Sequence, residues 1–418
     1  MMQSLQAADR TFVIALVAAE ESGDQLGAAL IRALKERTGE RVRFAGVGGR
    51  EMAAQGLASP FPIDDLAIIG FAAIPRRLPV ILRRIRDTAE LVLAAEPDAL
   101  VIIDSPDFTH RVARRVRAAA PSIPILDYVS PSVWAWRPGR ARAMRRYVDL
   151  VLALLPFEPR AHQRLGGPPC TYVGHPLLEQ LAQLRPSPEE AERRLAEPPI
   201  LLFLPGSRGG EIRRLLATFG QALGLLAAAR LTAGSAPFEI VLPTLPHLRE
   251  RIAAATADWP LQPRIVVEAK DKQAAFRVAR AALAKSGTVT LELALAGIPM
   301  VTAYKVSLIE EMVARLAIQV PSAILPNLIL EQNVVPEFLQ RQCTPQNLAD
   351  ALAPLLAPLP AQSPQRQRQL DAFARLDSIM KVDTARAEEL QSPSARAADL
   401  VLGLARAPAA EPSAPPPR

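Results

Sequence analysis

The chain has 418 residues, of which 50% are hydrophobic and 22% charged; this composition excludes a disordered or fibrous protein and allows roughly two or three domains. With 2 cysteines the chain cannot form a disulfide framework, and its 4 histidines form no metal-ligand pattern with them. The net charge of +7 permits anionic partners (nucleic acid, a phospholipid surface or a phosphorylated substrate) without choosing between them.

Short apolar runs alternate with amphipathic stretches in the first half of the chain, which predicts α/β units built on a parallel sheet. The first run, residues 12–19, is also compatible with a weak signal peptide, but it leads directly into a turn and a helix, so we expect a buried strand. Ser22 and Gln25 have capping-box spacing, which predicts that Ser22 caps this helix. Further strands are predicted at residues 43–47, 99–103, 123–129 and 150–155.

The alternation is interrupted at about residues 174–198, where proline-rich segments are typical of a connection between domains, and it then resumes. Strands are predicted in the second half at residues 200–204, 238–242, 265–267, 281–284 and 298–302. We therefore predict an α/β fold of two doubly wound Rossmann-like domains facing a central cleft, with ligands at the carboxyl ends of the strands. The predicted parts are two domains at 1–175 and 176–345, C-terminal helices at 346–406 and a disordered tail at 407–418.

Two strand-to-helix turns in the second domain are candidates for a nucleotide-phosphate site. In the first turn, Gly206 permits close approach of the backbone, Ser207 can donate a hydrogen bond, and Arg208 is a permanent cation suited to phosphate. A capped turn with a surface arginine is the alternative interpretation. The turn lacks the spacing of a Walker motif.

The second turn begins with Ser286, Gly287 and Thr288. Free N–H groups at the start of a helix bind phosphate well. Glu292 lies about one helical turn further on, where a carboxylate could accept hydrogen bonds from ribose hydroxyls. Simple helix capping is again the alternative, but two such turns in one sheet favour a nucleotide.

Two features of the first domain are candidates for catalysis or binding. Asp104 follows the apolar strand 99–103, so it is a candidate general base, and Asp107 is a weaker one; turn formation and helix capping are the alternatives. Trp134 and Trp136, two of the three tryptophans, lie in one loop beside Arg137. This loop is either a binding surface or a local mini-core.

Segment 66–86 mixes apolar side chains with arginines, a pattern that suits contact with anionic lipid. An ordinary amphipathic helix packed on the sheet, with a solvated basic face, is the alternative. No apolar run in the chain reaches the ~18 residues of a membrane-spanning helix. The apolar residues expected to contact the membrane or an acyl chain are Ile68, Ile69, Phe71, Ile74, Leu78, Ile81 and Leu82.

A series of motifs, in order from about residue 12 to residue 345, resembles the lipid-A-disaccharide synthase family. The most specific is the string Tyr-Val-Ser-Pro-Ser-Val-Trp-Ala-Trp-Arg at 128–137. The others lie at 20–24, 46–52, 104–108, 156–158, 174–176, 204–208, 286–292 and 325–327. The chain departs from the family at Ala19, where Gly is usual, and at Thr109, where Asn is frequent; neither change removes a proposed catalytic group.

This resemblance implies an inverting glycosyltransferase of the GT-B type that uses no metal and no cofactor. It would join UDP-2,3-diacylglucosamine to the 6-hydroxyl of 2,3-diacylglucosamine 1-phosphate, giving a β-1,6 disaccharide and UDP. Asp104 would be the base, Arg208 and the 286–288 turn would neutralise the departing UDP, and Glu292 would hold the ribose. Other matched positions implied at the substrate site are Glu20, Ser22, Asp24, Asp107, Trp134, Trp136, Arg137, His175 and Asn327.

The resemblance also implies a cytoplasmic protein that associates peripherally with the inner membrane of a Gram-negative cell and forms a homodimer. Segment 66–86 would then contact the membrane or the acyl chains. A first alternative is another GT-B enzyme acting on a UDP-sugar, such as an epimerase or a soluble-acceptor transferase. A second alternative, a basic nucleic-acid-binding protein, is disfavoured because lysine-rich tracts and recognisable nucleic-acid modules are lacking.

Overall fold

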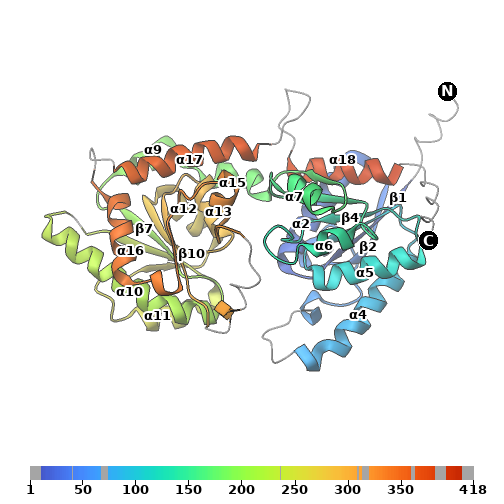
Figure 1. Cartoon of the computed structure of the whole chain (residues 1–418), viewed down its shortest axis with the longest axis horizontal. Helices are drawn as coiled ribbons and strands as arrows, with labels where there is room; N and C mark the ends of the chain where they lie inside the picture. Colours follow the sequence, from blue (N-terminus) through green and yellow to red (C-terminus); the bar gives the residue numbers. More distant parts are fainter. Residues whose placement is uncertain are drawn as a thin grey trace. The chain divides into compact units, whose positions relative to one another are not determined.

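The computed structural model describes residues 11–39, 41–66, 74–235, 237–307, 310–312, 320–358, 363–381 and 392–406, with the backbone alone at 74–77. The chain forms two compact units (Figure 1). Unit 1 comprises Met1–Leu178 together with Val382–Arg418, and unit 2 comprises Glu179–Lys381. Each unit contains one sheet of six strands with the order given below, and every strand pair is parallel.

The sheet of unit 1 has the order β2-β1-β3-β4-β5-β6. Its strands are β1 (Phe12–Ala18), β2 (Val42–Val47), β3 (Ala99–Ile103), β4 (Ile125–Tyr128), β5 (Leu150–Ala153) and β6 (Cys170–Tyr172). The apolar sequence of β3 is buried along its whole length, as expected for a parallel strand covered on both faces. β1 pairs with β2 on one side and β3 on the other, which confirms the predicted buried strand.

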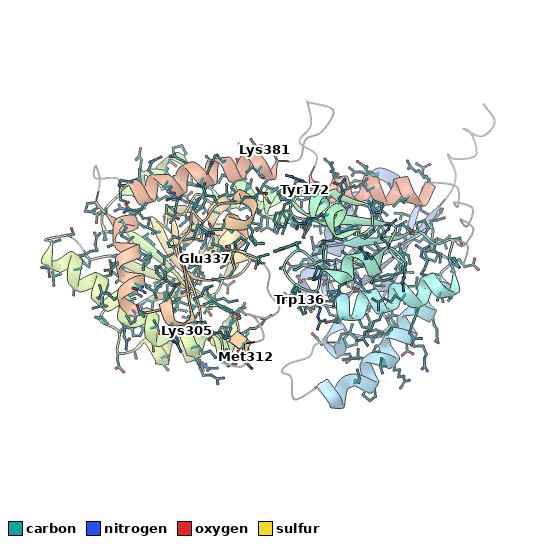
Figure 2. All side chains as sticks on the ribbon, viewed as in Figure 1. Trp136, Tyr172, Lys305, Met312, Glu337 and Lys381 are labelled. Atoms are coloured by element: carbon teal, nitrogen blue, oxygen red, sulfur yellow. The ribbon has the colours of Figure 1, made fainter. Side chains whose placement is uncertain are left out.

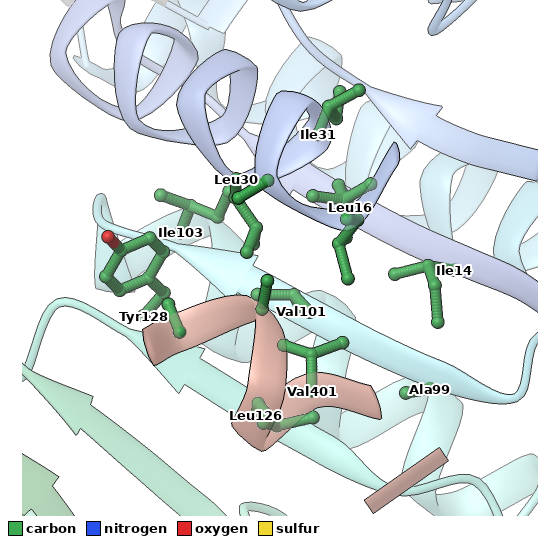
Figure 3. Close-up of a cluster of buried hydrophobic side chains, with 14 of the residues drawn as sticks. Ile14, Leu16, Leu30, Ile31, Ala99, Val101, Ile103, Leu126, Tyr128 and Val401 are labelled. Carbon is green, nitrogen blue, oxygen red and sulfur yellow. The ribbon is translucent and has the colours of Figure 1, made fainter. Parts of the chain in front are cut away.

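Helices cover both faces of this sheet (Figure 1). Successive strand residues point to opposite faces of the sheet. Ile14 and Leu16 of β1 therefore pack with one helix layer (Figure 3), whereas Ala15 and Val17 pack with the other. The first layer holds α2 (Glu21–Thr38) and α18 (Pro393–Arg406). The second holds α4 (Ile74–Ala94), α5 (Pro106–Ala119) and α6 (Gly139–Met144), and the unit also contains α3 (Arg50–Ala54), η2 (Ile63–Leu66) and α7 (Glu158–Leu165).

The last helix joins the first unit, although the sequence analysis grouped all C-terminal helices together. Val401 of α18 packs into the same core as Leu30 of α2 (Figure 3), and Leu402 belongs to that core as well. Arg37 of α2 forms an ion pair with Asp399 of α18. Burial of this apolar stripe against α2 and the sheet places α18 in unit 1. The preceding helices, α16 (Pro345–Leu352) and α17 (Pro364–Met380), belong to unit 2.

The predicted serine cap of α2 is wrong. The helix begins at Glu21, its N-cap residue is Glu20, and no described side chain caps it. Ser22 lies inside the first turn, and its hydroxyl donates a 3.1 Å hydrogen bond to Oδ2 of Asp104 instead. A contact distant in sequence has therefore replaced the local one that the spacing predicts.

The sheet of unit 2 has the order β12-β11-β10-β7-β8-β9. Its strands are β7 (Ile200–Leu204), β8 (Glu239–Pro243), β9 (Arg264–Val266), β10 (Ala281–Lys285), β11 (Met300–Tyr304) and β12 (Glu337–Leu339). All predicted strands of both units are confirmed to within about two residues at their ends. The short edge strands β6 and β12 were not predicted, because neither contains an apolar run.

Helices also cover both faces of this second sheet. One face packs on α10 (Gly209–Thr232), α11 (Arg249–Thr256) and α16, and the opposite face contacts α12 (Ala269–Val278) and α13 (Val289–Leu295). Among the described helices, α10 alone has the length and apolar composition to cross a membrane. Its side chains Leu215, Phe219 and Leu223 are nonetheless buried in the core of unit 2.

The remaining elements are η4 (Pro176–Gln180), α8 (Leu181–Leu184), α9 (Pro188–Leu195), η5 (Pro246–Leu248), α15 (Leu325–Leu330), η6 (Gln340–Gln342) and η7 (Ala353–Leu356).

The predicted connection at 174–198 is largely a packed part of unit 2. Helix α9 begins with a full capping box formed by Ser187 and Glu190. The buried Arg194 donates hydrogen bonds to the carbonyl oxygens of Phe276, Arg277, Ala296 and Gly297, which end two other helices. A guanidinium at these carbonyl groups also complements the helix dipoles, so α9 is firmly tied to the unit.

A buried acid organises the region where β5 meets α7. The carboxylate of Glu158 accepts hydrogen bonds from the amide of Leu155 (3.0 Å) and from Nε1 of Trp134 (3.0 Å). Burial raises the pKa of Glu158 from 4.5 to about 7, because desolvation outweighs these two hydrogen bonds. The folded protein thus holds this proton more tightly than the unfolded chain does.

We predict that Glu158 makes the fold less stable as the pH rises from about 4.5 to about 7, the window between its unfolded and folded pKa values. In urea unfolding at pH 5 and pH 8, the wild type should lose on the order of 2 kcal/mol more stability than Glu158→Gln. Other titrating groups change the unfolding free energy of both proteins alike, so their contribution cancels when the two pH dependences are subtracted. An identical pH dependence in both would contradict the raised pKa.

Candidate active site

The strand order of unit 1 reverses between β1 and β3. From β1 the chain proceeds to β2 on one side, and it returns to β3 on the other. In parallel sheets, ligands bind at the carboxyl ends of the strands at such a reversal. Glu20 and Ser22 follow β1, and Asp104 follows β3. The hydrogen bond between the hydroxyl of Ser22 and the carboxylate of Asp104 therefore spans the reversal itself.

Asp104 and Ser105 both have left-handed backbones, with φ of +52° and +44°. Non-glycine residues adopt this conformation at an energetic cost and mainly where the surrounding structure imposes it, which is common in active sites. The amide of Asp104 donates to the carbonyl oxygen of Tyr128 (3.1 Å), and the hydroxyl of Thr109 donates to the carbonyl oxygen of Asp104 (2.6 Å). Thr109, where the family often has Asn, thus supports the strained turn.

The carboxylate of Asp104 is half-buried and holds two hydrogen bonds. Oδ2 accepts from Ser22, and Oδ1 accepts from the amide of Ser105 at 2.7 Å. The buried Oγ of Ser105 has no hydrogen-bond partner among the described residues. A carboxylate and an unused hydroxyl accordingly adjoin each other at the end of β3.

Asp24, predicted at the substrate site, is buried and binds backbone. Its carboxylate accepts hydrogen bonds from the amides of Gly49 (2.7 Å), Glu51 (2.9 Å) and Met52 (3.0 Å) at the start of α3. A Cβ atom on Gly49 would lie 2.5 Å from Oδ2 of Asp24, so glycine is required there. Asp24 therefore fixes the 46–52 turn beside β1, while Glu20 remains exposed.

The two tryptophans of the 130–137 loop have different surroundings. Trp134 is tied to Glu158 by its indole N–H and packs edge-on against Phe157, with 5.0 Å between ring centroids. The side chain of Trp136 is labelled in Figure 2. It is 38% exposed, and the guanidinium carbon of Arg137 lies 4.2 Å from its ring centroid. The loop is therefore a mini-core at one tryptophan and a cationic surface at the other. Asp107 is exposed and forms an ion pair with Arg140 at 3.3 Å.

Unit 2 has its own reversal of strand order, between β7 and β10. The turn after β7 holds Gly206 at a φ of +108°, and Arg208 follows with its side chain 84% exposed. β10 pairs directly with β7, so the 286–288 turn is its neighbour at the same sheet edge. The two turns that the sequence analysis singled out for phosphate are thus brought together.

An ion pair that the sequence analysis missed links these two turns. Nζ of Lys285 lies 3.1 Å from Oε1 of Glu211, and Nη1 of Arg208 lies 3.7 Å from the same oxygen. Lys285 could have been noticed as a cation that ends an otherwise apolar strand. Glu211 carries no comparable signal, because a glutamate in the first turn of a helix is common.

Two residues of the second turn have informative surroundings. Ser286 is buried, and its Oγ lacks a hydrogen-bond partner within the part of the chain that the structure describes. Glu292, predicted to hold ribose, forms an ion pair with Lys272 of α12 at 2.8 Å. The Lys272 partner was not predicted, because it comes from a separate helix.

Two other predicted residues have structural partners. Asn327 is buried and uses all its hydrogen-bonding capacity: Nδ2 donates to Val335 and Glu337, and Oδ1 accepts from the amides of Val334 and Val335. His175 accepts from the amide of Leu177 (3.2 Å), and burial lowers its pKa to about 4, so the imidazole is neutral at pH 7. The hydrogen bonds of Asn327 to Val334, Val335 and Glu337 hold the segment that leads into β12.

The predicted membrane segment is described only in part. Ile68, Ile69 and Phe71 lie outside the described residues, as does the side chain of Ile74. Leu78 and Leu82 are each 43% exposed, whereas Ile81 packs against the core. The C-terminal part of α4 packs on the sheet, because Ile85, Ala89 and Val92 are buried in the core. Across the residues that the structure describes, no cluster of His, Cys, Asp or Glu could hold a metal ion.

Comparison with known proteins agrees with the resemblance seen in the motifs. The lipid-A-disaccharide synthetase family model matches residues 14–390. The lipid-A-disaccharide synthase of Nitrobacter hamburgensis is 62% identical over 396 residues, which cover 95% of this chain and 96% of that protein. The lipid-A-disaccharide synthase of Rhodospirillum centenum is 42% identical over 398 residues, 94% of this chain and 95% of that protein.

Solved structures with a similar fold are more distant in sequence. The crystal structure of MurG from Acinetobacter baumannii has a TM-score of 0.55 and 17% identity, and it covers 94% of this chain and 99% of its own. That of a kitacinnamycin glycotransferase has a TM-score of 0.57 and 17% identity, with 95% and 100% covered. At these identities the likeness concerns the fold, which is the predicted GT-B type. From the family match and the full-length relatives, the chain belongs to the lipid-A-disaccharide synthase family of glycosyltransferases.

Proposed function

We propose that this protein transfers 2,3-diacylglucosamine from UDP-2,3-diacylglucosamine to the 6-hydroxyl of 2,3-diacylglucosamine 1-phosphate. The products are the β-1,6 disaccharide 1-phosphate and UDP. The observation that carries this proposal is the position of Asp104 at the strand-order reversal of unit 1, in a chain of this family. An epimerase or a soluble-acceptor transferase would need no acyl-binding surface.

Asp104 is the proposed general base. As the acceptor 6-oxygen attacks the anomeric carbon, Asp104 removes the hydroxyl proton, and the bond from that carbon to the UDP oxygen breaks on the opposite face. The electron pair of the broken bond leaves with UDP, and the configuration inverts. The Ser22 hydroxyl and the Ser105 amide on the two carboxylate oxygens support this role, because they fix the orientation of the base before substrate binds.

The departing UDP is proposed to bind at the reversal of unit 2. Arg208 would bind its phosphates together with the backbone of Gly206 and Ser207, and Ser286, Gly287 and Thr288 would line the neighbouring turn. The exposed guanidinium of Arg208 and the unpartnered hydroxyl of Ser286, judged against the described residues, support this placement. Glu292 would accept from the ribose while Lys272 balances its charge.

Peripheral docking to the cytoplasmic face of the inner membrane is proposed for α4. Leu78, Val80 and Leu82 are between 43% and 46% exposed on this helix. Arg83 and Arg86 lie nearby with side chains 74% and 57% exposed. Both arginines also form long ion pairs with Asp87, at 3.7 Å and 3.5 Å, but their guanidinium groups stay largely exposed. Exposed apolar side chains beside exposed arginines suit the headgroup region of an anionic bilayer, where the acylated substrates are found.

The reaction is tested by UDP release from UDP-2,3-diacylglucosamine in detergent with EDTA, with and without the acceptor. We expect release only with acceptor, accompanied by a disaccharide in the mass spectrum, and EDTA should have no effect. Release without acceptor would instead indicate a hydrolase or an epimerase. Failure to form disaccharide by folded protein would overturn the proposal.

We predict that Asp104→Asn lowers kcat by about 10²–10⁴-fold, because the amide cannot take the acceptor proton. The affinity for UDP, measured by calorimetry, should be unchanged, since Asp104 belongs to unit 1 and UDP is proposed to bind unit 2. Asp64→Asn, which neutralises an exposed carboxylate of the same unit, is the matched control. Near-normal turnover by Asp104→Asn would show that another group is the base.

We predict that the double substitution Leu78→Asp and Leu82→Asp weakens binding to vesicles of anionic phospholipid by about tenfold or more, because it removes apolar contact and adds negative charge. Co-sedimentation with vesicles measures this. Leu225→Asp on α10 is a control of matched 43% exposure and should leave sedimentation unaltered. Equal binding by the α4 variant and the wild type would place the docking surface elsewhere.

A further inference from the structure

Lys285 and Glu211 form an ion pair that the proposed reaction does not yet use. Lys285 is the last residue of β10, and Glu211 lies in the first turn of α10. Their charged atoms are 3.1 Å apart, and their side chains are only 17% and 11% exposed. Burying two charged groups to this extent removes much of their hydration, which costs free energy. A pair at this position is therefore more than an ordinary surface ion pair, and it could serve a ligand.

The pair reaches both glycine turns at the strand-order reversal. A Cβ atom on Gly206 would lie 2.7 Å from Oε2 of Glu211, and a Cβ atom on Gly287 would lie 3.4 Å from Nζ of Lys285. The ammonium therefore lies over the 286–288 turn, and the carboxylate lies over the 206–208 turn. An anion seated on these two turns would meet both charges.

Other groups around the pair favour an anion over a neutral ligand. Arg208 lies 3.7 Å from Glu211, so the three side chains together carry one excess positive charge. The Lys285 ammonium also lies 5.0 Å from the ring centroid of Tyr304, which orients it without neutralising it. Ser286, the next residue, contributes a buried hydroxyl that no described group engages.

We propose that Lys285 binds the diphosphate of the UDP-sugar directly, with its ammonium shared between Glu211 and phosphate oxygens when the ligand is bound. An ammonium has three N–H donors, so it can retain the carboxylate on one side and bind phosphate on another. Lys285 then adds a second cation to Arg208 where negative charge develops on the leaving group. This inference rests on the proposed function, because that function supplies the diphosphate.

A purely structural role for Lys285 makes a different prediction from direct binding. If Lys285 only neutralises Glu211, then removing both charges restores the turn and with it UDP affinity. If Lys285 contacts phosphate, the double variant still lacks the cation and still binds weakly. Glu211→Gln alone should bind UDP at least as tightly as the wild type, since it removes a negative charge beside the diphosphate.

The experiment is calorimetric titration of the full chain with UDP and with UMP. We expect Lys285→Met to weaken UDP binding by about tenfold or more, as the loss of a charge-assisted hydrogen bond does, with a smaller effect on UMP. We expect the double variant Lys285→Met with Glu211→Gln to remain weak. Lys270→Met, which removes an exposed lysine of the same unit, should bind as the wild type does.

The outcomes separate this inference from the proposed reaction. Wild-type UDP affinity in folded Lys285→Met, or its return in the double variant, overturns the role of Lys285 while leaving the reaction intact. If Lys285→Met and the double variant both bind UDP weakly, but the wild type forms no disaccharide, the binding role of Lys285 is retained and the proposed reaction is overturned. Failure of the wild type to bind UDP overturns both. Urea unfolding midpoints for each variant establish that the protein is folded.

Discussion

Both candidate sites depend on one constraint, which is the reversal of strand order beside the first strand of each sheet. After β1 the chain adds β2 on one side and places β3 on the other; after β7 it adds β8 and β9 on one side and places β10 on the other. The connections from the central strands then leave the sheet edge in opposite directions, so neither covers the carboxyl ends. The residues that follow these strands are consequently the ones available to a ligand, whatever else the units bind.

The turns at the two reversals reach a positive φ with different residue types. In unit 2 the turn after β7 uses Gly206, which adopts a positive φ without a Cβ clash. In unit 1 the turn after β3, the strand across the reversal from β1, is formed by Asp104 and Ser105, whose left-handed backbones cost of order 1–3 kcal/mol each. A glycine would avoid that cost but would remove the carboxylate. Strands β1 and β4 on either side of β3, together with Thr109 and the carbonyl of Tyr128, hold the strained turn in place.

Much of this arrangement is predictable from sequence, and the remainder has a common reason. Strands such as 99–103 and 200–204 are continuous apolar runs, and the turns that follow them were recognised as candidate sites. What local pattern could not predict was the distant partner of each side chain. Ser22 has the spacing of a cap but bonds to Asp104. Asp24 and Asn327 have the chemistry of ligands, but Asp24 binds backbone amides and Asn327 binds backbone groups and Glu337. Helix α18 returns to unit 1. Short edge strands were missed because two or three half-buried residues leave no periodic signal.

The charges at the two reversals are of opposite kinds, and this difference fits the proposed transfer. The described hydrogen bonds to the carboxylate of Asp104 come from a hydroxyl and an amide, so a proton can be added there without breaking an ion pair. At the reversal of unit 2, Arg208 and Lys285 outnumber Glu211, so negative charge can develop where positive charge is already fixed. In the proposed in-line displacement, the acceptor hydroxyl loses a proton, and the electron pair of the broken bond leaves with UDP. The proposed proton acceptor therefore belongs to one unit, and the cations proposed to stabilise the leaving group belong to the other.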